Sequence, residues 1–178
     1  MDNAEGTLRV RAETAEDLSA IRKLNKKAFK GNDESKLIDA IRESDGFIPG
    51  LSLVAEKDGK IVGHILFSPV KIKGPSGAAP ALALAPMAVL PAFQNQGIGS
   101  GLVKYGLDEC RKLGHKIVVV VGHADYYLRF GFVKAGEKGL QLPFEAPDEI
   151  FMVIELVQGA LNEVKGTVEY PPAFHAAT

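Results

Sequence analysis

The segment 81–121 is the part of the sequence that most constrains the fold. An apolar run from Ala81 to Leu90 is followed by a glycine-rich turn (Gln94–Gly101), a helical pattern to about Leu113 and a continuous apolar run, Ile117–Val121. The last run is typical of a strand that is buried on both faces. A strand–helix–strand unit of this kind is a crossover connection, which is almost always right-handed. The segment therefore predicts two neighbouring parallel strands with a helix packed on one face of their sheet.

The flanking segments predict further strands and helices. Alternating or continuous apolar patterns indicate strands, and apolar residues at spacings of three and four indicate helices. These patterns predict strands at about 7–12, 51–56, 60–72 and 151–157, helices at about 15–29 and 33–43, and a short helical turn at 125–130. The pair Asp58-Gly59 predicts a hairpin between two of the strands. The fold class is therefore α/β of the α+β type, with a mixed and mostly antiparallel sheet.

Length and composition indicate one globular domain. The chain has 178 residues, of which 46% are hydrophobic and 24% charged, and both values are ordinary for a folded domain. We expect a single domain over residues 1–178, with its core at about 7–157 and an irregular C-terminal tail at about 165–178.

Charge, apolar runs and cysteine content narrow the class of protein. Because the formal net charge is −1, we expect no nucleic-acid partner. The longest apolar stretch, Ala78–Val89, contains two prolines and is shorter than the ~20 residues that span a bilayer, so we expect no membrane association. The only cysteine is Cys110, and the N-terminus lacks the pattern of a signal peptide. Both features favour a cytoplasmic protein, and no cluster of side chains has metal-site spacing.

The glycine-rich turn is the strongest candidate for a binding site. Glycines allow close approach to a ligand, and the first turn of the helix offers free N–H groups and a partial positive charge, which together suit a phosphate. A Walker loop would need a lysine after Gly99, where Ser100 stands, and the spacing of Gly97, Gly99 and Gly101 does not fit a dinucleotide fingerprint. On the turn alone, a tight packing turn without a ligand is an equally good interpretation.

The wider pattern resembles the acetyl-CoA signature of the GNAT superfamily of N-acetyltransferases. The pattern Gln94-x-x-Gly97-x-Gly99 follows the strand ending in Met87-Ala88-Val89, and Tyr127-Leu128-Arg129-Phe130-Gly131-Phe132 is similar to that family's Tyr-x-x-x-Gly-Phe segment. The segments His123–Tyr127 and Tyr170-Pro171-Pro172 are similar to its YhbS-like bacterial branch.

This resemblance implies a fold and a cofactor. The fold would be a central twisted sheet of about six or seven strands flanked by about four helices, splayed at the strand before the glycine-rich loop. The pantetheine arm of acetyl-CoA would pair with the backbone of Met87, Ala88 and Val89. Its pyrophosphate would bind the N–H groups of the loop residues, namely Asn95, Gln96, Gly97, Ile98, Gly99 and Ser100. Pro86 gives a physical reason for broken pairing there, because a proline cannot donate to a strand ladder.

The resemblance also implies a direct transfer of an acetyl group to an amine in a ternary complex. Tyr127 matches the family's tyrosine that protonates the leaving thiolate, and a backbone N–H of Met87 or Val89 would hold the oxyanion. The general base is left open among His123, which follows the strand 117–121, and its rivals Glu149 and Glu155, or a water relay.

Two other functions and several acceptors remain open at the level of sequence. The first alternative is a non-catalytic acyl-CoA-binding module in which Tyr127 only packs, and the second is a nucleotide-dependent enzyme of another class. The acceptor is a small-molecule or peptide amine, and its selectivity would lie in the loops near Gly31 and 45–50 and in the segment after Gly136. Because these pieces contain the apolar residues Phe47, Ile48, Phe144 and Phe151 with few charges, we expect a partly apolar pocket. Homodimers are common among such enzymes, but no sequence feature indicates one here.

Overall fold

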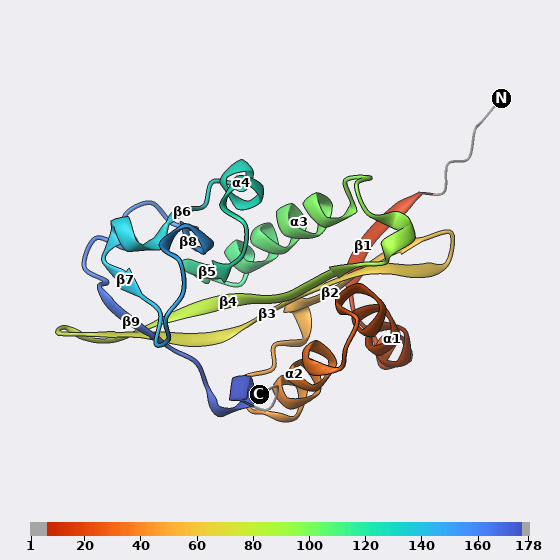
Figure 1. The fold of residues 1–178 in the computed structure, drawn as a ribbon, viewed down its shortest axis with the longest axis horizontal. Coiled ribbons are helices and arrows are strands. Elements are labelled where there is room, and N and C mark those ends of the chain that lie inside the picture. Colours follow the sequence, from red (N-terminus) through yellow and green to blue (C-terminus); the bar gives the residue numbers. More distant parts are fainter. Residues whose placement is uncertain (1–6, 176–178) are drawn as a thin grey trace.

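A computed structural model of the chain describes residues 7–175 and shows a nine-stranded mixed sheet with four α-helices among them (Figure 1). The helices are α1 (Leu18–Phe29), α2 (Asp33–Glu43), α3 (Ile98–Lys112) and α4 (Ala124–Tyr127). The strands are β1 (Leu8–Ala12), β2 (Ser52–Lys57), β3 (Lys60–Gly74), β4 (Gly77–Val89), β5 (Ile117–Val121), β6 (Val133–Lys134), β7 (Leu140–Gln141), β8 (Phe151–Glu155) and β9 (Gly166–Glu169). The predicted fold class is confirmed, and the strand number is higher because three short strands were not predicted.

The strand order is β1-β2-β3-β4-β5-β8-β6, and β9 joins this sheet by pairing with β3 and β7. All pairs are antiparallel except β4 with β5 and β7 with β9. The crossover predicted over 81–121 is thus confirmed, with α3 connecting the parallel strands β4 and β5.

The helices form two layers on opposite faces of the sheet (Figure 1). Helices α3 and α4 lie on one face, and α1 and α2 lie on the other. The largest buried cluster packs α3 against the sheet, with Phe67 and Leu102 both fully buried. A smaller cluster joins Ile38 and Ile41 of α2 to the sheet, and a third lies among β3, β4, β5, β8 and β9. Each amphipathic pattern in the sequence therefore corresponds to a helix with one buried face.

The C-terminal segment differs from the prediction. Residues Gly166–Glu169, which were expected to be part of an irregular tail, form β9 and pair with Lys71–Lys73 of β3. The segment was not recognised because it has four residues and only Val168 among them is buried. Its pairing with a long neighbouring strand, rather than its own pattern, makes it a strand. The predicted strand at 151–157 ends at Glu155.

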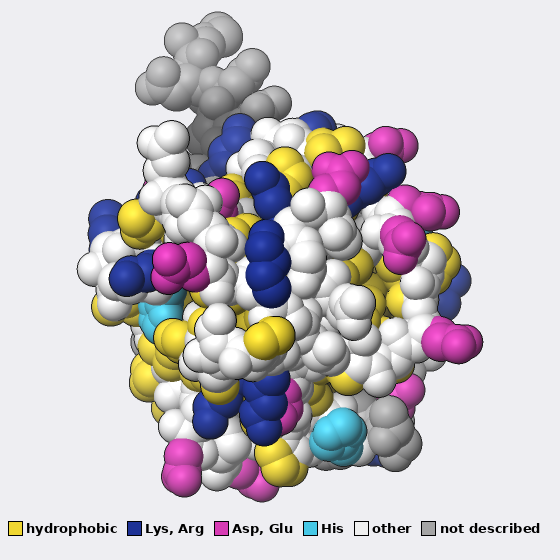
Figure 2. Space-filling view, turned by 90° about the vertical axis from the view of Figure 1, so that its left-hand side faces the viewer, with side chains coloured by type: hydrophobic (Ala, Val, Ile, Leu, Met, Phe, Trp, Pro, Cys, Tyr) yellow, Lys and Arg dark blue, Asp and Glu magenta, His cyan; other side chains and the backbone are white. Residues whose placement is uncertain are grey.

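The surface is not dominated by one sign of charge on the face drawn in Figure 2, where Lys and Arg side chains are interspersed with Asp and Glu. Among residues 7–175, no helix is long and apolar enough to cross a bilayer.

Candidate functional site

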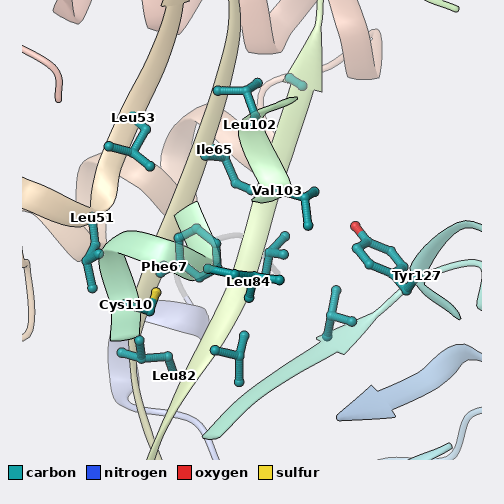
Figure 3. Packing of buried hydrophobic residues seen from close by; sticks show 14 of the residues in the cluster. Leu51, Leu53, Ile65, Phe67, Leu82, Leu84, Leu102, Val103, Cys110 and Tyr127 are labelled. Carbon is teal, nitrogen blue, oxygen red and sulfur yellow. The ribbon is translucent and has the colours of Figure 1, made fainter. Parts of the chain in front are cut away.

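Strands β4 and β5 separate after two residue pairs. Leu82 lies opposite Val118 and Ala83 opposite Val119, and beyond these the structure of residues 7–175 pairs no residue of β5 with β4, although both strands continue. Figure 3 shows the two strands diverging from this point. Near the separation, the pairing of β3 with β4 also shifts register, between Ile65 and Phe67. The C-terminal part of β4 therefore has an open edge on the side of β5.

The alternation of an antiparallel pair decides which backbone groups of β4 face this open edge. The N–H group of Leu90 donates to the carbonyl of Val62, at 2.9 Å, so Leu90 faces β3. Since successive residues face opposite edges, Ala88 also faces β3, and Met87 and Val89 face the open edge. The side chain of Gln94 donates to the carbonyl of Val89, at 3.2 Å. The N–H groups of Met87 and Val89 are thus left for another partner.

The glycine-rich loop leads directly into α3. Asn95 and Gly97 both have positive φ, of 64° and 84°, a conformation that glycine adopts without strain. The first bond of the helix joins the N–H of Gly101 to the carbonyl of Gly97, at 3.0 Å. The N–H groups of residues 98–100 precede this bond and have no acceptor within the helix. They lie at its positive end, which suits an anion.

The side chains of the loop differ in their surroundings. The side chain of Gln96 is exposed and donates to the carbonyl of Ala92, at 3.4 Å. Ile98 is buried against the core, and Ser100 is half-buried. The loop can therefore offer a ligand its backbone while Ile98 anchors it to the sheet.

Tyr127 lies at the mouth of the separation. Only 7% of the residue is exposed, and its ring packs edge-on against Phe132, with centroids 5.5 Å apart. Figure 3 shows its hydroxyl pointing toward the space between the strands, on the side of Leu84 and Val103. Burial, with a smaller effect of Tyr126, raises the pKa of Tyr127 to about 12. The phenol therefore keeps its proton at neutral pH and can act as a proton donor.

Two glycines make room for the tyrosines of α4. A Cβ atom on Gly122 would lie 2.5 Å from Cε2 of Tyr127, and one on Gly99 would lie 2.8 Å from the hydroxyl of Tyr126. The same Cβ on Gly99 would be 3.6 Å from Cε of Met87. Strand β4, the start of α3 and α4 therefore meet at Gly99. The proximity of Tyr126 to this point was not predicted from the sequence.

The candidate bases occupy different places. His123 is exposed and immediately precedes α4, and its carbonyl accepts from the N–H of Tyr127, at 3.2 Å. Glu149 is exposed in a short 3₁₀ helix, Asp148–Ile150. Glu155 accepts from the N–H of Leu161, at 3.1 Å, and is already engaged in holding a turn. Among the residues described, no group of three His, Cys, Asp or Glu side chains is arranged to hold a metal ion.

A cavity of about 540 Å³ opens at the separation on the other face of the sheet. Its lining includes Ala83–Ala85 of β4 and Val119–Val121 of β5, together with Leu37 of α2. Because α2 lies on the face opposite α3 (Figure 1), the cavity and the glycine-rich loop approach the separation from opposite faces. The C-terminal residues Tyr170 and Phe174 also line it, although the sequence placed them in an irregular tail.

Comparison with known proteins agrees with this arrangement. Residues 18–132 match the Acetyltransferase (GNAT) family. The chain belongs to the GNAT family. It is thus an N-acetyltransferase, as expected from the resemblance noted in the sequence.

Individual relatives extend the similarity over nearly the whole chain. The uncharacterized N-acetyltransferase YhbS of Escherichia coli K12 is 36% identical over 167 residues, which cover 93% of this chain and 98% of the relative. The crystal structure of E. coli YhbS in complex with CoA has a TM-score of 0.90 at 34% identity, covering 98% of this chain and 95% of that one. A GNAT acetyltransferase of Brucella melitensis in complex with acetyl-CoA has a TM-score of 0.78 at 33% identity, covering 95% and 99%.

Proposed function

We propose that this GNAT enzyme uses acetyl-CoA and transfers the acetyl group directly to an amine, with Tyr127 as the general acid. The observation that carries the proposal is the open edge of β4, which is left where the pairing of β4 with β5 ends. The hydroxyl of Tyr127 points into the space between the two strands (Figure 3). The relatives bound to CoA and acetyl-CoA support this cofactor.

The cofactor would extend along the open edge toward α3. Its pantetheine arm would pair with the backbone of Met87 and Val89, as an added strand does at a sheet edge. Ala88 lies between them, and its backbone groups face β3, where it pairs with His64. Its backbone is therefore used within the sheet and is not offered to the cofactor. The pyrophosphate would bind the N–H groups of the loop Asn95–Ser100, in particular those of the first helical turn.

The reaction would proceed by direct attack of the neutral amine. A primary amine has a pKa of about 10.4, so a base must first take its proton at neutral pH. The nitrogen then forms a bond with the thioester carbon, and the N–H of Met87 or Val89 holds the oxyanion. When the carbon–sulfur bond breaks, the thiolate takes the proton of Tyr127. The attacking nitrogen loses its extra proton as the amide forms, and this proton returns through solvent to the phenolate of Tyr127. His123 is our candidate for the base, since Glu155 is bound to the backbone.

The substitution Tyr127→Phe tests the proposal. We expect kcat for CoA release with amine acceptors to fall by about 10²–10⁴-fold, with the Kd for CoA unchanged. The control is Tyr105→Phe, because Tyr105 is exposed on α3 and should leave kcat unchanged. Equal kcat in the Tyr127→Phe variant and the parent would refute the role of Tyr127. Binding of CoA without turnover of any amine would instead support the non-catalytic acyl-CoA-binding module.

A thermal-shift titration separates the cofactors. A ligand at 100 times its Kd stabilises a protein by about 2.7 kcal/mol, which corresponds to several degrees in Tm at this size. We expect a shift with acetyl-CoA and with CoA but none with NAD. A shift with NAD alone would return the protein to the class of nucleotide-dependent enzymes.

A further inference from the structure

The 540 Å³ cavity differs in chemistry from the edge that faces the cofactor loop. Its lining is mostly apolar and comes from β3, β4, β5, β9, α2, the connection between β7 and β8, and the segment after β9. The volume lies in the range of about 300–1,000 Å³ that is typical of small-molecule sites. Because Ala83–Ala85 and Val119–Val121 line it, one end of the cavity is the point where the two strands separate.

Three aromatic rings form one wall of the cavity. Phe144 stacks on Tyr170, with ring centroids 6.2 Å apart and planes at 30°, and Tyr170 contacts Phe174 at 5.0 Å. All three line the cavity. Within residues 7–175 the hydroxyl of Tyr170 has no hydrogen-bond partner. The wall therefore offers aromatic surface with one polar atom at its centre.

The charges at the cavity largely compensate each other. Lys73 and Glu169 both line it and form an ion pair of 2.6 Å, and the neighbouring β4 residues are Ala83, Leu84 and Ala85. A ligand that carries a charged group in addition to its reacting amine would lose the hydration of that group in the cavity. The group would find no unpaired opposite charge there, and this loss of hydration is costly. The lining thus disfavours polyamines and amino acids with a free carboxylate.

We propose that the acceptor is a primary amine on an apolar body, either arylalkyl or branched alkyl, and that the Phe144–Tyr170–Phe174 wall selects it. The proposal rests on the proposed function, because it places the amine at the end of the cavity where β4 and β5 separate. The apolar body occupies the aromatic wall, and the nitrogen reaches the thioester from the face opposite α3. An apolar cavity also favours the neutral form of the amine, which is the form that attacks.

The test compares amines of different character. We would measure kcat/KM for CoA release with 2-phenylethylamine and isoamylamine against spermidine, L-glutamate and a lysine-containing peptide. We expect kcat/KM to be at least about tenfold higher for the two apolar amines, since apolar contacts in a pocket discriminate by about 10–200-fold.

A matched pair of variants tests the aromatic wall. Phe144→Ala should raise KM for 2-phenylethylamine about tenfold and leave KM for acetyl-CoA unchanged, and Phe144→Leu should restore part of the loss. Leu113→Ala is the control, because Leu113 and Phe144 have the same exposed fraction, 53%, and Leu113 lies just after α3. Substitution of such exposed side chains should leave the fold intact, and Tm verifies this.

The outcomes separate the two proposals. An active enzyme that prefers spermidine, glutamate or the peptide would overturn the inference and leave the proposed function standing. The same holds if Phe144→Ala and Leu113→Ala have equal KM for 2-phenylethylamine. If calorimetry shows that 2-phenylethylamine binds in a Phe144-dependent manner but no acetyl transfer occurs, the proposed function fails while the selectivity of the cavity is supported. A protein that neither binds nor acetylates apolar amines refutes the inference.

Discussion

The buried histidine of β3 makes the stability of the fold dependent on pH. His64 is fully buried, and its Nε2 lies 3.0 Å from Oγ of Ser52. Ser52 donates its hydroxyl proton to Glu13, which also accepts from Arg42. Since that proton is used, the serine oxygen must accept from Nε2–H of His64, which leaves Nδ1 as the unprotonated nitrogen. Nδ1 has no partner among the residues described.

The pKa of His64 follows from this arrangement. A second proton would sit on Nδ1 without an acceptor, and burial, with a smaller effect of Arg42, lowers the pKa from 6.5 to about 3. Between these two values the unfolded chain binds the proton and the folded chain does not, so stability falls as the pH decreases below 6.5. At pH 5 the 1.5-unit distance from 6.5 corresponds to about 2 kcal/mol, or about 4–8 °C in Tm.

The assay is urea unfolding at pH 7.5, 6.5 and 5.0 for the parent and for His64→Gln. The amide of Gln can donate to Ser52 but does not titrate, so we expect the loss of about 2 kcal/mol between pH 7.5 and 5 to shrink to a small remainder. Part of that remainder comes from His115, whose pKa partial burial also lowers. His123→Gln, which removes an exposed histidine, should keep the full loss. Identical losses in the parent and His64→Gln would refute the reasoning.

Two further predictions concern the site and the N-terminal cap. Gly122→Ala should displace the ring of Tyr127, because the new Cβ would lie 2.5 Å from it. We expect kcat to fall at least about tenfold and the Kd for CoA to stay unchanged. An unchanged kcat would contradict this prediction. Asp17 accepts from Arg11 and from the N–H of Thr14, both at 2.7 Å, and these bonds lower its pKa to about 2. Asp17→Asn should therefore lower the free energy of unfolding by about 1–2 kcal/mol at pH 7, as measured by urea unfolding. The difference from the parent should shrink below pH 4, where the aspartate of the unfolded chain is protonated. A difference that is independent of pH would contradict this role of the Asp17 carboxylate.

The elements with complete patterns of their own were predictable from the sequence. Helix α2 was predicted at about 33–43 and spans Asp33–Glu43, and the strand Ile117–Val121 has the predicted bounds. In both cases a local apolar pattern and the adjacent turn residues indicate the same structure. β9 lacks such a pattern. It approaches β3 so closely that a Cβ on Gly166 would lie 1.9 Å from the carbonyl of Lys73, a contact between segments far apart in the sequence.

The motifs of the proposed cofactor side were easier to recognise in the sequence than the residues of the proposed acceptor side. The loop around Gly97 and the segment containing Tyr127 are continuous motifs, so their spacing is visible in the sequence. The cavity instead combines residues from β4, β5, α2 and the C-terminal segment. Phe144 was expected near the acceptor and lines the cavity. Phe151, named with it, is buried in the core, and Phe47 lies under the guanidinium of Arg42.

The separation of β4 from β5 relates the two sides of the site to each other. If β4 and β5 were paired along their whole length, the backbone groups on their facing edges would hydrogen-bond to each other. The sheet would then be closed between α3 and the cavity. Because pairing stops at Ala83 and Val119, the N–H groups of Met87 and Val89 are left for the cofactor in the reaction that we propose. In the same proposal, this opening would give an amine in the cavity access to the thioester. A substitution that extended the pairing would therefore impair cofactor binding and amine access together, whereas a change in the aromatic wall should affect the amine alone.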